Sequence, residues 1–427
     1  MLLAGLLLVA ALAGCAGRTA GEGAPPRVAP PPSSVFVYVA TTGGDIYRFE
    51  LERESGRLGL RVAVASGRPL ASLAADRRGR FLYGAAAGSG EVAAYGIRAR
   101  GGGLASLGRA PARGAGTTAL VVHGSGKYVL AANSGSGTVA VFPTRPDGSL
   151  GTAQVYPSGA GPRTLAAHPL AQAVFVVDLG ASTVFQFAFN TGTGILTPSR
   201  ESPVSLPPGA IPGGITFGPD GRFAYLLEED QGTGQVASYA FEPTSNTLSV
   251  LAFQVVPLAG GTEGAHPKGD SKPAPKGDHR PRKRSGSPPA GARGARNASS
   301  LTRAPDGNSG PAGANLRGAG LEVTPDGRFL YAADPVHDRV AIFAIDKESG
   351  ALEPVGGGED ARGRRPKALA LADGGRILLV AHPGSDSVAS FRVDLATGKL
   401  LHVTTAPVGA PPVGMTAVTV TETPAVN

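Results

Sequence analysis

Four cationic side chains stand shortly before short apolar segments of the kind that form β-strands. These are Arg68, Arg163, Arg317 and Lys367. If those strands converge, the four cations and Thr117 surround one mouth of a central funnel. Guanidinium and ammonium groups gathered there would bind anions such as carboxylates or phosphorylated glycans. Alternatively, the cations only keep the mouth hydrated, and their positions alone do not separate the two interpretations.

Metal, cofactor and covalent chemistry find little support in the sequence. The seven histidines form no His-x-His or His-x-x-x-His pair, so no metal site is predicted. His123 and His168 occupy equivalent turns of two repeats and are expected to be turn residues on the side opposite the mouth. The glycine-rich stretches 88–90 and 135–137 lie between expected strands with no helix after them, so no phosphate loop and no cofactor are predicted.

A seven-fold repeat supplies the elements that must position these side chains. In each repeat a branched apolar residue precedes an aromatic residue by three positions. The pairs are Ile46/Phe49, Val92/Tyr95, Val139/Phe142, Val184/Phe187, Val236/Tyr239, Val340/Phe343 and Val388/Phe391. Successive aromatics lie 46, 47, 45, 52, 104 and 48 residues apart, and the 104 holds one repeat plus an insertion. This period is typical of a four-stranded propeller blade.

The order of segments within a repeat predicts four antiparallel strands. An apolar inner segment leads into a glycine turn such as Pro325-Asp326-Gly327, and then into a strand rich in aromatic residues. A small loop, the Val-x-x-aromatic strand and an outer strand follow. We therefore predict an all-β, seven-bladed propeller over residues 35–421, followed by a short tail at 422–427.

The two ends of the repeat region indicate how the ring closes. The first repeat begins at Phe36 without an inner strand before it, whereas residues 413–421 form a surplus segment of inner-strand type. We expect this C-terminal strand to join the first blade, because pairing would cover two exposed sheet edges.

The N-terminal residues indicate export and attachment to a membrane. Residues 2–11 are an apolar run too short to span a bilayer, and the run ends in Leu-Ala-Gly followed by Cys15, the only cysteine. The pattern is similar to a bacterial lipobox, so residues 1–15 are expected to be a signal peptide and Cys15 the lipidation site. An ordinary signal peptide is the alternative. Residues 16–34 would form a proline-rich tether, which predicts a lipid-anchored protein of the cell envelope, in the periplasm or outer membrane if Gram-negative.

The insertion explains the positive charge of the chain. The net charge is +8, and residues 261–320 contribute eleven Lys/Arg against four Asp/Glu, or +7. Because the rest is nearly neutral, no nucleic-acid partner is predicted. Residues 261–318 have few apolar side chains and are expected to be disordered. We expect a monomer.

The phrase Pro-Asp-Gly-Arg-Phe-Leu-Tyr, followed by a loop and Val-x-x-Phe, resembles the lactonase-type seven-bladed propeller family. That family includes propeller 6-phosphogluconolactonases and a carboxymuconate-lactonizing enzyme. The resemblance implies a site where the inner strands begin. There, Arg163 replaces a family histidine, Lys367 replaces an arginine, and Glu229 matches a glutamate. The family's acidic position before the Thr-Pro-Asp-Gly turn is Gly320, and Pro212-Gly213-Gly214 lacks two polar residues.

Three functions are consistent with this pattern. Lactone opening needs a base and cationic stabilisation of the oxyanion, roles that Glu229, Arg163 and Lys367 could fill. Because so much of the family pattern is missing, our leading interpretation is a module that binds a small anionic ligand or an envelope protein. The alternative is a lactone hydrolase, with an envelope substrate if the chain is exported. A purely structural scaffold is the third.

Overall fold

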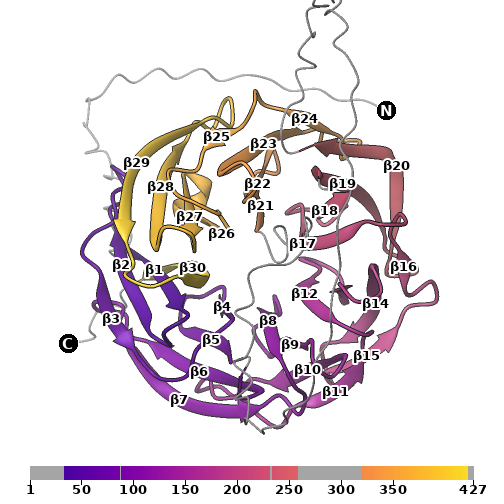
Figure 1. Ribbon diagram of the computed structural model, residues 1–427. Helices are drawn as coiled ribbons and strands as arrows, with labels where there is room; N and C mark the ends of the chain where they lie inside the picture. Colours follow the sequence, from indigo (N-terminus) through magenta and orange to yellow (C-terminus); the bar gives the residue numbers. More distant parts are fainter. Residues whose placement is uncertain (1–32, 87, 231–232, 258–319, 422–427) are drawn as a thin grey trace, which may run out of the picture.

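The computed structural model describes residues 33–86, 88–230, 233–257 and 320–421. Within them, seven antiparallel sheets stand around a central axis, as Figure 1 shows. The predicted all-β, seven-bladed propeller is therefore confirmed. The described residues contain one helical element, the 3-10 turn η1 (Asp373–Gly375).

Each blade has four main strands, which follow one another in order from the central axis to the rim. The inner strands are β30 (Pro412–Thr421), β4 (Ser72–Ala75), β8 (Thr117–Val122), β12 (Pro162–Ala167), β17 (Ile211–Phe217), β21 (Leu321–Val323) and β26 (Ala368–Ala372). The second strands are β1 (Ser33–Thr41), β5 (Phe81–Ala86), β9 (Tyr128–Asn133), β13 (Ala173–Asp178), β18 (Phe223–Asp230), β22 (Phe329–Asp334) and β27 (Ile377–His382).

The outer half of each blade is more irregular. The third strands are β2 (Ile46–Leu51), β6 (Glu91–Ile97), β10 (Thr138–Pro143), β14 (Thr183–Asn190), β19 (Thr233–Glu242), β23 (Arg339–Ile345) and β28 (Ser387–Val393). The outermost are β3 (Val62–Ala65), β7 (Leu104–Pro111), β11 (Gln154–Pro157), β15 (Ile195–Pro198), β20 (Thr247–Pro257), β24 (Leu352–Pro354) and β29 (Leu400–Pro407). Two short strands, β16 (Val204–Ser205) and β25 (Glu359–Asp360), add to the third strands β14 and β23.

The C-terminal strand closes the ring as predicted. Strand β30 pairs antiparallel with β1, from Ser33 opposite Thr421 to Thr41 opposite Pro412. The first blade therefore combines the beginning and the end of the described chain. Strand β1 begins at Ser33, two residues before the expected start of the propeller.

The hydrophobic core lies between blades. Six clusters of buried apolar side chains each span neighbouring blades, for example Phe49 of the first blade with Leu379 of the seventh. A single blade therefore cannot bury its faces alone, and the repeats form one body.

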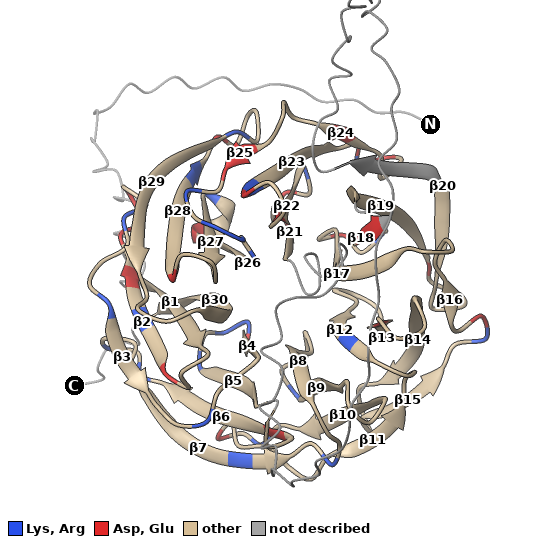
Figure 2. Ribbon diagram, viewed as in Figure 1, with Lys and Arg blue, Asp and Glu red and all other residues tan. Residues whose placement is uncertain are grey.

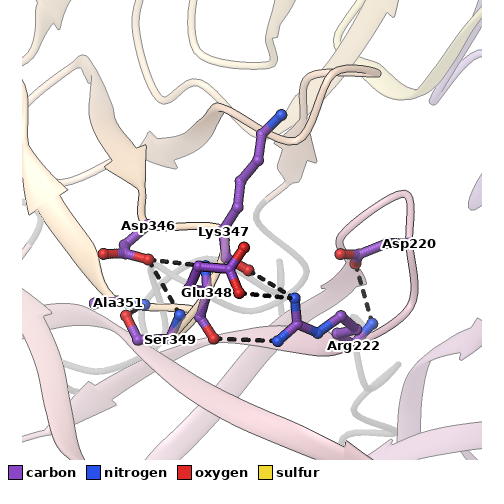
Figure 3. Close-up of polar contacts among 7 residues, drawn as sticks. All are labelled: Asp220, Arg222, Asp346, Lys347, Glu348, Ser349 and Ala351. Carbon is purple, nitrogen blue, oxygen red and sulfur yellow. Dashed lines mark hydrogen bonds and ion pairs between the residues drawn. The ribbon is translucent and has the colours of Figure 1, made fainter.

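The repeated turn-strand phrase joins the fifth blade to the sixth and the sixth to the seventh. Arg222 donates hydrogen bonds to the carbonyl oxygens of Lys347 and Glu348, both at 3.2 Å, and forms an ion pair with the Glu348 carboxylate (Figure 3). Arg328 donates to two carbonyls of the seventh blade in the same way, and the Tyr331 hydroxyl donates to Gly398 O at 2.8 Å. These contacts between blades explain why the same residues recur in this phrase of the sequence.

Several predicted features lie outside the described residues. These are Cys15 with the signal peptide and most of the tether, the insertion at 261–318 with Arg317, and the tail at 422–427. Lipid anchoring, the envelope location and the disordered insertion stay predictions. Across the described part of the chain, no helix is long and apolar enough to cross a membrane.

Candidate functional site

A cavity of about 500 Å³ lies where the seven inner strands meet. Each inner strand, or the residues directly before it, contributes to the lining. Most of the lining side chains are small or apolar, such as Ser72, Ala119, Thr164 and Gly414. The few charged groups in the cavity therefore decide its chemistry.

Two predicted cations, Arg163 and Lys367, line this cavity together. Figure 2 shows the corresponding basic segments beside β12 and β26, near the centre of the ring. Burial lowers the pKa of the Lys367 ammonium, and the positive charges of Arg163 and Arg365 lower it further. Repulsion between cations held this close would be relieved by an anion between them.

One contact within the fourth blade and one with the third blade hold Arg163 in place. Strand β12 begins at Pro162, and the Asp178 carboxylate accepts a hydrogen bond from the Gly161 N–H at 3.0 Å. The Thr118 hydroxyl of the third blade donates to Arg163 O at 3.4 Å. Both main-chain contacts orient the segment from which the guanidinium extends.

The segment before Lys367 is tied to its neighbours in a similar way. Lys367 N–H donates to Ala381 O at 3.0 Å, and Lys367 O accepts from Gly320 N–H at 2.6 Å. Arg365 adopts a left-handed backbone with φ 56°, and its N–H donates to the Asp338 carboxylate at 2.6 Å. Non-glycine residues in this conformation occur more often at functional sites, where the surroundings hold them in place.

The carboxyl group in the cavity belongs to Glu322 of β21, a residue that sequence reasoning missed. Burial raises the pKa of Glu322 to about 8. Side chains two apart on a strand point to the same face, and Gly320 and Glu322 both line the cavity. The family pattern has an acidic residue where this chain has Gly320. An acid two residues further along the same strand face was the signal that could have indicated Glu322.

The other predicted site residues lie elsewhere. Glu229 is 3% exposed near the end of β18 and does not appear among the described residues that line the cavity. Thr117 is fully buried and donates to Asn133 Oδ1 at 2.8 Å, whereas its neighbour Thr118 lines the cavity. Arg68 is an exposed residue that pairs with Glu91 at 3.1 Å. The structure thus brings together Arg163 and Lys367, but not Glu229.

The histidines singled out in the sequence stabilise turns. His168 Nδ1 accepts hydrogen bonds from the N–H groups of Leu170 and Ala171, at 3.1 and 2.6 Å. His123 Nδ1 accepts from the Ser125 N–H at 3.1 Å. Within the described ranges, no three His, Cys, Asp or Glu side chains gather in a way that could hold a metal ion.

Comparison with known proteins places this geometry in a family. A family model described as lactonase, seven-bladed β-propeller, matches residues 35–277 and 291–417. This chain belongs to the lactonase propeller family. A 6-phosphogluconolactonase of Bacillus subtilis (strain 168) is 27% identical over 333 residues, which cover 74% of this chain and 79% of the relative.

Solved structures support the same fold. A periplasmic gluconolactonase of Pseudomonas aeruginosa superimposes with a TM-score of 0.69 at 24% identity, covering 91% of this chain and all of that chain. A Lactobacillus plantarum protein gives a TM-score of 0.67 at 20% identity, covering 90% of this chain and 99% of that one. At these identities the likeness concerns the fold alone.

Proposed function

We propose that this protein is a lactone hydrolase that acts in the central cavity. One observation carries the proposal: in a member of the lactonase family, a single cavity of about 500 Å³ collects two cations and one carboxyl group. Lactone hydrolysis therefore has more support than a binding module with a degenerate site.

The chemistry of lactone opening matches these groups. Attack of water on the ring carbonyl places negative charge on the carbonyl oxygen, and the product is a carboxylate. Arg163, which stays cationic at any physiological pH, and Lys367 would stabilise this charge. The small lining side chains leave room for a sugar-sized ring, since the cavity falls within the range of small-molecule sites.

Relatives suggest the class of lactone. The names of the relatives point to gluconolactone and its 6-phosphate. If the predicted export is correct, the natural substrate is a sugar lactone present in the envelope, and the enzyme works from its lipid anchor at Cys15.

The proposal is tested by the acid released from glucono-δ-lactone and from its 6-phosphate, measured at constant pH. The parent should hydrolyse at least one of the two faster than the spontaneous rate. Lys367→Met should lower kcat/KM on that lactone about a hundredfold, the usual effect of losing one oxyanion contact.

Lys399→Met is the matched control, because Lys399 is an exposed residue of the same blade, in the turn before β29. It should keep the rate of the parent. No turnover of either lactone by the parent would refute the proposal, as would a Lys367→Met variant as active as the parent.

A further inference from the structure

Glu322 is the one charged residue in its ring of equivalent positions. Inner-strand residues are called equivalent here when they pair with the same position of the second strand in their own blade. In the sixth blade, Glu322 pairs with Tyr331. The other six members are Ala74, Val121, Ala166, Thr216, Ala370 and Thr416. A carboxyl group set alone among such small side chains loses the solvation that favours its charged form.

Position 320, two residues before Glu322, cannot hold this carboxyl group. A Cβ atom at Gly320 would lie 2.8 Å from Leu369 N and 3.2 Å from Lys367 O, both main-chain atoms of the seventh blade. The hydrogen bond from Gly320 N–H to Lys367 O draws the two segments together. An acidic side chain at position 320 would force the two segments apart, whereas Glu322 lines the cavity two residues further along.

Glu322 lies further along its inner strand than the residue that contacts the Lys367 main chain. A strand advances about 3.3 Å per residue, so Glu322 lies about 7 Å along the axis from Gly320, which contacts the Lys367 main chain. A lactone ring held in the cavity could therefore meet the cations on one side and this carboxyl group on the other.

We propose that the Glu322 carboxylate is the acid-base group of this site, a role that rests on the proposed lactone hydrolysis. The carboxylate takes a proton from water as the water oxygen bonds to the lactone carbonyl carbon. The carbon–oxygen bond of the ring then breaks, and the protonated Glu322 returns the proton to the departing ring oxygen. Lactone and water give a hydroxy acid, and Glu322 ends as it began.

The raised pKa of Glu322 gives this role a pH signature. With a pKa of about 8, only about a tenth of the carboxyl groups are ionised at pH 7, and each ionised group is a stronger base than an ordinary carboxylate. The enzymatic rate should climb from pH 6 and level off above pH 8, after subtraction of the spontaneous reaction.

The test compares pH–rate profiles of the parent and Glu322→Gln on the lactone that the parent hydrolyses. The variant should lose 10²- to 10⁴-fold in kcat, as is usual when an acid-base group is removed, and should show no inflection near pH 8. Glutamine has the shape of the protonated acid that prevails at neutral pH, so the fold should be kept, and thermal unfolding checks this.

Two further variants complete the test. Glu353→Gln alters an exposed glutamate on β24 of the same blade and should behave as the parent. Glu229→Gln examines the sequence-based assignment directly. If Glu322→Gln keeps the rate and the inflection of an active parent, the role of Glu322 is refuted while lactone hydrolysis stands. An inactive parent refutes lactone hydrolysis itself.

Discussion

At the scale of single residues, the cavity separates positive charge from a carboxyl group that resists ionisation. Arg163 and Lys367 lie at the beginnings of inner strands, and Glu322 lies further along β21 in a ring of small side chains. Its pKa is raised by burial, whereas the pKa of Lys367 is lowered by burial and by other cations. Such opposite shifts in one cavity are typical of sites that move protons.

The raised pKa of Glu322 also predicts how stability depends on pH. The folded chain keeps a proton on Glu322 up to about pH 8, whereas the unfolded chain releases it near the ordinary glutamate value. The folded state therefore binds more protons in this range, and the free energy of unfolding should fall as pH rises from about 5 to about 8.

Urea unfolding of the parent and of Glu322→Gln at pH 5 and pH 8 measures this effect. Glutamine cannot ionise, so the variant should lose less stability than the parent between the two values. An equal loss in both proteins would show that Glu322 ionises as readily in the folded chain as in the unfolded one.

Sequence reasoning found the cations of the site but not its acid, for a physical reason. Arg163 follows the pair Gly161-Pro162, and Lys367 follows Pro366. Each of these short motifs precedes an apolar segment and so marks the beginning of an inner strand. Glu322 lies inside a strand, where a lone acid resembles an ordinary solvent-facing residue. Whether its side chain faces water or the cavity depends on six other blades, and no local pattern contains that information.

At the scale of elements, the contacts between blades explain why one phrase recurs in the sequence. Gly398 ends the turn before β29 with φ 73°, and a side chain there would overlap the Phe329 ring of the preceding blade. The hydroxyl of Tyr331 donates to Gly398 O, as Tyr38 and Tyr83 donate to Gly102 and Gly148 in other blades. Turn glycine and strand aromatics are therefore parts of one contact.

Removing one such hydroxyl should weaken the propeller measurably. Tyr331→Phe keeps the ring but leaves the buried carbonyl of Gly398 without this donor, which should cost about 1 to 2 kcal/mol in the free energy of unfolding. Tyr47→Phe is the control, because the Tyr47 hydroxyl donates within its own blade, to the Asp45 carboxylate at 3.2 Å. Denaturant unfolding gives both values, and equal stabilities of the two variants would contradict the account of these contacts.

At the scale of the whole molecule, closure of the ring creates the cavity. Strand β30 supplies the inner strand of the first blade, and its residues Val413, Gly414 and Met415 line the cavity beside the other six blades. The period of the repeats and the surplus C-terminal strand were sufficient to predict this architecture. The activity was harder to predict, because propellers of one design host many functions.

The central claim is that lactones are opened inside this cavity, and filling the cavity tests it most directly. Thr164 of β12 lines the cavity beside Arg163, so Thr164→Phe would occupy the space without removing a charge. Thr197→Phe places the same bulk on an exposed position of β15 in the same blade.

The measurement is the initial rate of lactone hydrolysis at constant pH for the parent and both variants, with thermal unfolding as a check of the fold. We predict turnover by the parent and by Thr197→Phe, and a loss of at least tenfold in Thr164→Phe at unchanged unfolding temperature. A Thr164→Phe protein as active as the parent, or a parent without turnover, would contradict the account.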